Sequence, residues 1–277
     1  ELPTEGAVVD PRVDPTGRYV AYSSAGALRV VTIDGRDDRQ LVHPDGDGVS
    51  WGLADFIGAE ELDRSRGYWW SPDSRFIAFL RLDESPVPKF ILTNDIPIDQ
   101  TVETTFYPQA GDPNPTVKLG IADVAKSSLV PNAGRIPRLG DRLPPSLQRL
   151  GDAVKFVDLA GYKPEDLLIA RVAWAPESKN VFFQALNREQ TFLDLNSAGL
   201  NGKFTKVLTE TTPAWVEVYD NPAFIGDGQT AVWLSARNGQ THLYLYDNNG
   251  QLVRQLTNGK WEVRNLYGID PSGQYAY

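Results

Sequence analysis

Turn-forming residues followed by a run of apolar residues recur along this chain. The pattern is clearest in residues 14–22 (Asp-Pro-Thr-Gly-Arg-Tyr-Val-Ala-Tyr), 71–79 (Ser-Pro-Asp-Ser-Arg-Phe-Ile-Ala-Phe) and 175–183 (Ala-Pro-Glu-Ser-Lys-Asn-Val-Phe-Phe), with weaker copies at 225–233 and 270–277. Proline presets a turn and glycine or serine completes it, whereas β-branched and aromatic residues favour strands. Each copy therefore predicts a turn that leads into a β-strand.

The spacing of these copies indicates repeated sheets. Pro15, Pro72, Pro176, Gly226 and Pro271 occupy equivalent places, with gaps of 57, 104, 50 and 45 residues between them. Repeats of roughly 40–50 residues that each hold several strands are typical of β-propeller blades. A β-sandwich also combines short strands with Gly/Pro turns and is the alternative. We expect an all-β chain in which residues 1–277 form one unit, about five blades of a larger, open β-propeller.

The long second gap contains a proline-rich stretch, residues 83–115, that is too long for a hairpin loop. Its middle has strand character at residues 90–93 and 101–106. We interpret the stretch as an arm that leaves its blade and returns at Thr116. Such an arm carries apolar residues away from its own core, which favours packing against a second copy in a homodimer. An arm folded back on its own blade is the alternative.

Composition limits the function further. The net charge is -9 and there is no basic stripe, which argues against a nucleic-acid partner. There is no cysteine and no apolar run long enough to cross a membrane. The absence of cysteine leaves the compartment undetermined. The chain also has no signal peptide and no initiator methionine, and we expect it to be a fragment of a longer protein.

The sequence lacks the short motifs of common hydrolases, nucleotide-binding proteins and zinc peptidases. Of the two histidines, His43 precedes a proline in a polar turn, and His242 lies within an alternating strand. We therefore expect His43 to lie on the surface and His242 to be packed in the interior. Neither histidine is expected to belong to a Ser-His-Asp triad. Asp45 and Asp47 resemble half of a calcium loop without its remaining ligands. We therefore predict no metal and no cofactor.

Two adjacent acidic residues, Glu60 and Glu61, stand out because they lie in a segment rich in aromatic and aliphatic residues. Like charges side by side cost free energy unless a cation lies between them, and a free α-amino group is such a cation. On a short helix the two side chains diverge by roughly 100° but can reach one small cation at the helix end. A solvated acidic face is the other interpretation, and the spacing alone leaves both open.

Residues 56–66 are expected to form a short helical turn around this pair. Asp55 can cap its start, Gly67 can end it, and Asp63 can pair locally with Arg64. The next three residues, Tyr-Trp-Trp at 68–70, then enter the following blade. The apolar side chains expected to pack inward are Phe56, Ile57 and Leu62.

This part of the chain resembles the N-terminal propeller of the dipeptidyl peptidase IV family, within the prolyl oligopeptidase clan of serine peptidases. The Glu-Glu-Leu-Asp-Arg and Tyr-Trp-Trp combination is specific, and it is most similar to bacterial and cytosolic-type members. The matching stretches follow the order of the family over nearly the whole chain: residues 52–64, 67–73, 107–118, 242–247 and 256–263.

The resemblance implies an eight-bladed propeller, within the range of about four to eight blades that is usual for this architecture. It also implies that the parent protein is a peptidase that releases Xaa-Pro or Xaa-Ala dipeptides. It places binding of the substrate's free N-terminus on Glu60 and Glu61, and a place beside the extended substrate site on Tyr219. It also implies that the arm at 83–115 packs across a dimer interface.

The departures from the family are large. We expect the α/β-hydrolase domain that carries the catalytic serine, aspartate and histidine to be absent from residues 1–277, as is the upstream arginine that holds the substrate carbonyl. This chain would therefore contain no catalytic residue and would act with a missing C-terminal hydrolase domain. The rival hypothesis is a non-catalytic propeller that binds peptides or proteins.

Overall fold

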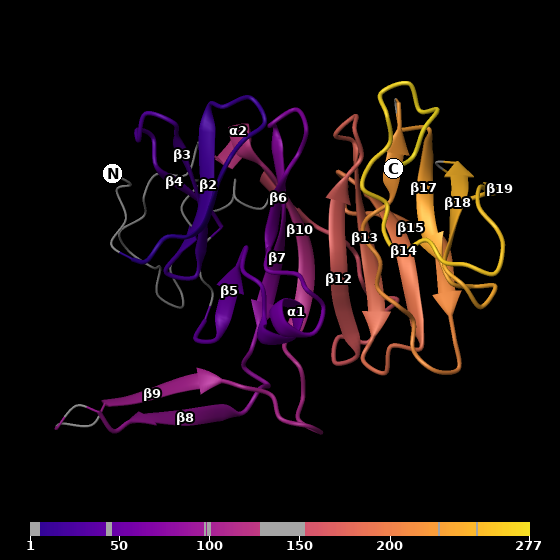
Figure 1. Cartoon of the computed structure of the whole chain (residues 1–277). Helices are drawn as coiled ribbons and strands as arrows, with labels where there is room; N and C mark the ends of the chain where they lie inside the picture. The colour runs from indigo at the N-terminus through magenta and orange to yellow at the C-terminus, as the bar shows by residue number, and fades with distance from the viewer. Residues whose placement is uncertain are drawn as a thin grey trace.

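A computed structural model describes residues 6–42, 46–96, 98, 101–127, 153–226, 228–247 and 249–277. The regular secondary structure of the described chain is almost entirely β: four antiparallel sheets follow one another along the sequence, and a separate two-stranded hairpin leaves the second. Figure 1 shows the sheets side by side in chain order, from indigo to yellow. The all-β prediction is confirmed at this level.

Three of the sheets are simple meanders whose strands pair in sequence order. Sheet I contains β1 (Val9–Val13), β2 (Tyr19–Ser24), β3 (Ala27–Thr32) and β4 (Arg39–Val42). Sheet III contains β12 (Leu167–Trp174), β13 (Asn180–Asn187), β14 (Phe192–Gly199) and β15 (Phe204–Thr211). Sheet IV contains β16 (Ala223–Ile225), β17 (Thr230–Ser235), β18 (His242–Asp247) and β19 (Leu252–Gln255).

Sheet II differs from the other three because two segments are inserted between its strands, residues 52–67 and residues 84–115. Its strands are β5 (Val49–Trp51), β6 (Tyr68–Trp70), β7 (Phe76–Asp83), β10 (Thr116–Asp123) and β11 (Val154–Phe156), and β5 and β6 both pair with β7. The helix α1 (Phe56–Glu60) lies between β5 and β6, and a second short helix, α2 (Val124–Ser127), follows β10. The insertion between β5 and β6 is the segment that carries the glutamate pair.

The recurring turn has the same geometry in all five copies. In each copy, the fourth residue donates its backbone N–H to the carbonyl of the first residue, at 2.9–3.0 Å. That fourth residue has a left-handed backbone in every copy, with φ between 61° and 82°. Three copies use glycine there, and two use serine, which tolerates this conformation less readily. The fourth-position residues are Gly17, Ser74, Ser178, Gly228 and Gly273.

Successive turns also touch one another. The backbone N–H of Thr16 in the first turn donates to Ser74 Oγ in the second at 3.3 Å, and that of Asp73 donates to Ser178 Oγ in the third at 3.0 Å. The serines at the left-handed position therefore link neighbouring sheets, which explains why a hydroxyl replaces glycine there.

Each sheet packs face to face with the next. One buried apolar cluster joins sheets I and II through Leu28 and Phe79, a second joins sheets II and III through Leu119 and Ile169, and a third joins sheets III and IV through Phe182. Burying both faces of the inner sheets explains why β7 and β13 are nearly continuous apolar runs.

The fifth turn copy leads only to an isolated bridge between Ile269 and Ala276, and no closed sheet occurs among the described residues. The predicted arm forms the hairpin of β8 (Lys89–Asn94) and β9 (Thr101–Phe106), which projects away from sheet II (Figure 1). It does not fold back along its own sheet. Within the part of the chain that is described, no helix is long and apolar enough to cross a membrane.

Candidate functional site

The glutamate pair lies at the end of α1, which is shorter than the predicted turn over 56–66. The helix ends at Glu60, and Glu61 is its C-cap, with its N–H donating to the carbonyl of Ile57 at 3.0 Å. Asp55 occupies the N-cap position, but its side chain makes no capping hydrogen bond. The prediction that the Asp55 side chain caps the helix is therefore wrong, because the Asp55 carboxylate binds another partner.

That partner is Arg64. Its Nη2 lies 2.9 Å from Asp55 Oδ1, and both side chains are buried, at 6% and 8% exposure. Two further donors of Arg64 are also used: Nε donates to the carbonyl of Ile169 on β12 at 3.0 Å, and Nη1 to that of Arg66 at 2.8 Å. Burial lowers the pKa of Arg64, and the nearby Asp55 opposes that shift. The predicted local pair with Asp63 is wrong, because Arg64 turns inward beneath the helix.

Gly58 is the residue that leaves room for this buried pair. A Cβ at this position would lie 2.2 Å from Arg64 Nη2 and 2.7 Å from Asp55 Oδ1. The helix and the ion pair can approach each other closely only because residue 58 has no side chain.

The apolar side chains of the segment fix it in place. Leu62 is 5% exposed and belongs to the cluster between sheets III and IV, where Ile57 packs against it. Phe56 does not turn inward as predicted: it is 37% exposed, and its ring lies 4.8 Å from that of Tyr107 at the base of the arm. The helix is thus held between sheet III on one side and the arm on the other.

Glu60 and Glu61 are both exposed. Among the described residues, no side chain forms an ion pair or hydrogen bond with either carboxylate. The segment thus buries one charged pair completely and leaves two neighbouring carboxylates open to a cation from outside.

Tyr219 lies in the loop between β15 and β16. Its hydroxyl is 2.7 Å from Thr241 Oγ1, and its ring packs against the apolar cluster of sheet IV around Leu234. Burial raises the pKa of this phenol above its usual value. The hydroxyl is therefore neutral near pH 7 and already hydrogen-bonded to Thr241. A ligand would contact the ring of Tyr219 rather than its hydroxyl.

Arg171 on β12 connects the two predicted parts of the site. Its Nη1 donates to the carbonyl of Leu62, directly after Glu61, and its Nε lies 3.8 Å from Asp220 Oδ1, directly after Tyr219. The sequence analysis missed this arginine. Its signal was a single charged residue in the otherwise apolar strand Leu-Leu-Ile-Ala-Arg-Val-Ala-Trp.

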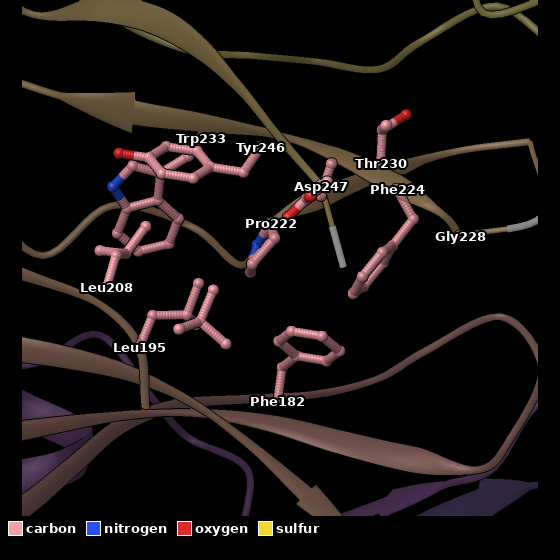
Figure 2. Close-up of a pocket in the computed structure, with 12 residues that line it drawn as sticks. Phe182, Leu195, Leu208, Pro222, Phe224, Gly228, Thr230, Trp233, Tyr246 and Asp247 are labelled. Atoms are coloured by element: carbon pink, nitrogen blue, oxygen red, sulfur yellow. The ribbon is translucent and has the colours of Figure 1, made fainter. Parts of the chain in front are cut away.

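Two cavities border the loop between β15 and β16. One, of about 250 Å³, has a polar wall and is bordered by Trp215, Glu217, Tyr219 and Arg237. The other, drawn in Figure 2, lies between sheets III and IV; Phe182 and Leu195 of sheet III line one side of it, and Phe224 and Trp233 of sheet IV line the other. Its volume of about 20 Å³ is that of a packing void rather than of a binding site.

Of the two histidines, the structure describes only His242. His242 is 3% exposed, with its ring nitrogens 3.2 Å from Thr257 Oγ1 and from the carbonyl of Gly259, as expected for a packed histidine. His43 and Asp45 lie outside the described residues. Within the described ranges, no three His, Cys, Asp or Glu side chains are grouped as metal ligands would be.

Comparison with known proteins identifies relatives of the whole chain. A family model described as the dipeptidyl peptidase IV (DPP IV) N-terminal region matches residues 1–277. The probable dipeptidyl peptidase 4 of Emericella nidulans is 27% identical over 291 residues, covering 95% of this chain and 33% of that protein. The corresponding protein of Neosartorya fischeri is 28% identical over 279 residues, with the same coverage.

A solved structure gives the same result. The crystal structure of Porphyromonas gingivalis dipeptidyl peptidase 4 matches with a TM-score of 0.80 and 27% sequence identity, covering 98% of this chain and 35% of that one. The chain thus spans about a third of the length of the relatives that it matches.

Proposed function

The chain belongs to the dipeptidyl peptidase IV N-terminal region family, and from this we propose that it is the substrate-gating part of a serine-type dipeptidyl peptidase. In this proposal the enzyme releases Xaa-Pro or Xaa-Ala dipeptides from peptide N-termini. The observation that carries it is the exposed carboxylates of Glu60 and Glu61, which have no ion-pair partner among the described residues, on a segment that buries the Asp55–Arg64 ion pair.

We propose that these two carboxylates bind the substrate's α-ammonium group. Hydrogen bonds between an ammonium and a carboxylate are charge-assisted and about twice as strong as neutral ones. Binding the N-terminus also fixes which peptide bond reaches the catalytic residues, because the distance from the amine to the scissile carbonyl is set by the substrate itself. The buried Asp55–Arg64 pair supports this role by holding the segment rigid.

Tyr219 has a lesser role in the proposal. It borders the 250 Å³ cavity, and its hydroxyl is bound to Thr241. We propose that the ring supplies an apolar wall for the substrate residues near the glutamate pair. No hydrogen bond from its hydroxyl to the substrate is needed.

The sheets are proposed to be blades of a larger, eight-bladed propeller, within the four to eight blades usual for the fold. Face-to-face packing of consecutive sheets and the contacts between successive turns support this architecture. The proposed catalytic serine, aspartate and histidine belong to an α/β-hydrolase domain of the same protein, and the serine forms an acyl-enzyme.

The arm is proposed to form a homodimer interface. All residues of β8 and most of β9 are exposed, including Ile91 and Val102 at 63% each. A two-stranded hairpin is marginally stable in isolation, and an exposed apolar surface on it favours a partner.

An assay of the full-length protein tests the proposal. Alanyl-prolyl p-nitroanilide should be cleaved, and N-acetyl-alanyl-prolyl p-nitroanilide should not. A serine-directed fluorophosphonate should abolish the activity. Absence of any dipeptide release, with retained binding of peptides, would favour the rival hypothesis of a non-catalytic binding module.

A further inference from the structure

Strand β12 is the surface on which the two substrate loops meet. The loop after Glu61 reaches it through Arg64, which donates to the carbonyl of Ile169. The loop after Tyr219 reaches it through Asn221, whose Nδ2 donates to the carbonyl of Val172 at 3.4 Å. Both loops therefore take their position from the same stretch of one strand.

The strand is irregular at this place. Its register with β13 shifts between Ile169 and Arg171, which marks a β-bulge. Bulges re-aim side chains and occur often beside active sites. Here the bulge directs a long cationic side chain, 15% exposed, to the gap between the loops.

Arg171 contacts both loops with different atoms of one rigid, planar group. Nη1 donates to the carbonyl of Leu62, and Nε faces Asp220 Oδ1 at 3.8 Å. Nη1 also donates to the carbonyl of its neighbour Ala170 at 3.0 Å, which fixes the side chain against its own strand. Because the guanidinium is planar and its donors have a fixed spacing, it sets the separation of the groups that it binds.

We infer that Arg171 is a positioning residue, which sets the distance between the Glu60–Glu61 pair and the Tyr219 wall of the proposed peptidase. The inference rests on the proposed amine-binding role of the glutamates. Arg171 touches no substrate in this account. It acts through Leu62 and Asp220, each next to a proposed substrate-binding residue.

The second loop has other attachments, so that loss of Arg171 leaves it folded. Gln184 is fully buried, and its Nε2 donates to the carbonyls of Tyr219 and Asp220 at 3.3 and 3.2 Å. The first loop likewise keeps the contacts of Arg64. The effect of removing Arg171 should therefore be a change in loop spacing rather than in folding.

The test compares Arg171→Met with Arg188→Met in the full-length protein. Arg188 is an exposed arginine on the turn between β13 and β14, in the same sheet, and serves as the matched control. For alanyl-prolyl p-nitroanilide, Arg171→Met should raise KM about tenfold, the effect of losing a hydrogen bond from a charged donor, and change kcat by less than about twofold. Arg188→Met should leave both unchanged.

Two further variants separate positioning from general damage. Asp220→Ala removes a side chain that is 86% exposed, so it should fold normally and raise KM about two- to threefold, in keeping with a partly exposed ion pair. Arg171→Lys keeps the charge but not the planar group, so its KM should lie between those of the wild type and Arg171→Met.

A double variant links the effect to the glutamates. If Arg171 acts through them, adding Arg171→Met to Glu61→Gln should raise KM by much less than it does in the wild type. Unchanged KM in Arg171→Met and Asp220→Ala, alongside impaired Glu60→Gln and Glu61→Gln, would overturn this inference alone. Full activity of the glutamate variants would overturn the amine-binding role, and this inference with it.

Discussion

The carboxylate of Asp55 and the guanidinium of Arg64 lie 2.9 Å apart beneath the helix that ends at Glu60. A buried ion pair gains little net stability over apolar residues, but losing one partner strands a charge in the interior. The pair is thus better understood as a fixed point beneath the glutamate-bearing segment than as a source of stability.

Removing one partner of this pair should be costly. Arg64→Met leaves the Asp55 carboxylate buried without compensation and should lower the free energy of unfolding by about 3–5 kcal/mol. Urea denaturation measures the loss. The control is Arg66→Met, an exposed arginine on the same segment, which should be near neutral. Equal stability of the two variants would show that the Asp55–Arg64 pair is not buried as described.

Gly58 should not tolerate a methyl group. Gly58→Ala places a carbon 2.2 Å from Arg64 Nη2, so the buried pair must move, at a cost of about 1–3 kcal/mol. Gly161→Ala is the matched control, because no atom lies within 4 Å of the added carbon there. Thermal denaturation of both variants measures the difference, and a Gly58→Ala protein as stable as the control would contradict the close packing.

The first repeat turn predicts a pH-dependent contribution to stability. Although burial acts to raise it, hydrogen bonds from Thr16, Ser74 and the backbone lower the pKa of Asp14 from 3.8 to about 2. Because the folded-state pKa is depressed, the stabilisation is complete above about pH 4 and is lost as the pH falls towards 2. A shift of this size corresponds to about 2 kcal/mol.

Asp14→Asn should therefore be about 2 kcal/mol less stable than the wild type at pH 7, and the gap should narrow between pH 4 and pH 2. Urea midpoints measured across that range test this. A gap that stays constant with pH would mean that the carboxylate charge is not what stabilises the turn.

The exposed face of the arm should control association. Ile91 pairs with Thr104 and Thr93 pairs with Val102, so the side chains of Ile91 and Val102 share one face of the hairpin. A charge there, as in Ile91→Glu, should convert a dimer of the full-length protein to a monomer in light scattering. Ile33→Glu, at an apolar residue that is 58% exposed in the turn after β3, should leave the mass unchanged. A dimer in both variants would exclude the arm as the interface.

The repeated turns were predictable because their conformation is local. An i→i+3 hydrogen bond and a left-handed fourth residue are set within a few residues and occur in all five copies, four of which also have a proline at the second position. The sequence did not distinguish the serines at 74 and 178 from the glycines, because their hydroxyls act on the neighbouring turn.

The buried polar contacts of the site were not predictable in this way. Asp63 was the expected partner of Arg64 because it is adjacent in sequence. Arg64 instead turns inward and donates to the carbonyl of Ile169 on β12 and to the carboxylate of Asp55. Arg171 was overlooked for the same reason: its partners, Leu62 and Asp220, are 109 and 49 residues away. Phe56 points outward because its ring packs against that of Tyr107 at the base of the arm.

The central claim is that Glu60 and Glu61 bind the substrate's free amine, and the full-length protein tests it most directly. Both residues are exposed, so Glu60→Gln and Glu61→Gln should fold normally. Each should lower kcat/KM for alanyl-prolyl p-nitroanilide by about tenfold or more, because one charge-assisted contact to the ammonium is lost. Glu165→Gln, an exposed glutamate outside the site, should have no effect. Near-normal kcat/KM in both Glu60→Gln and Glu61→Gln would contradict the claim.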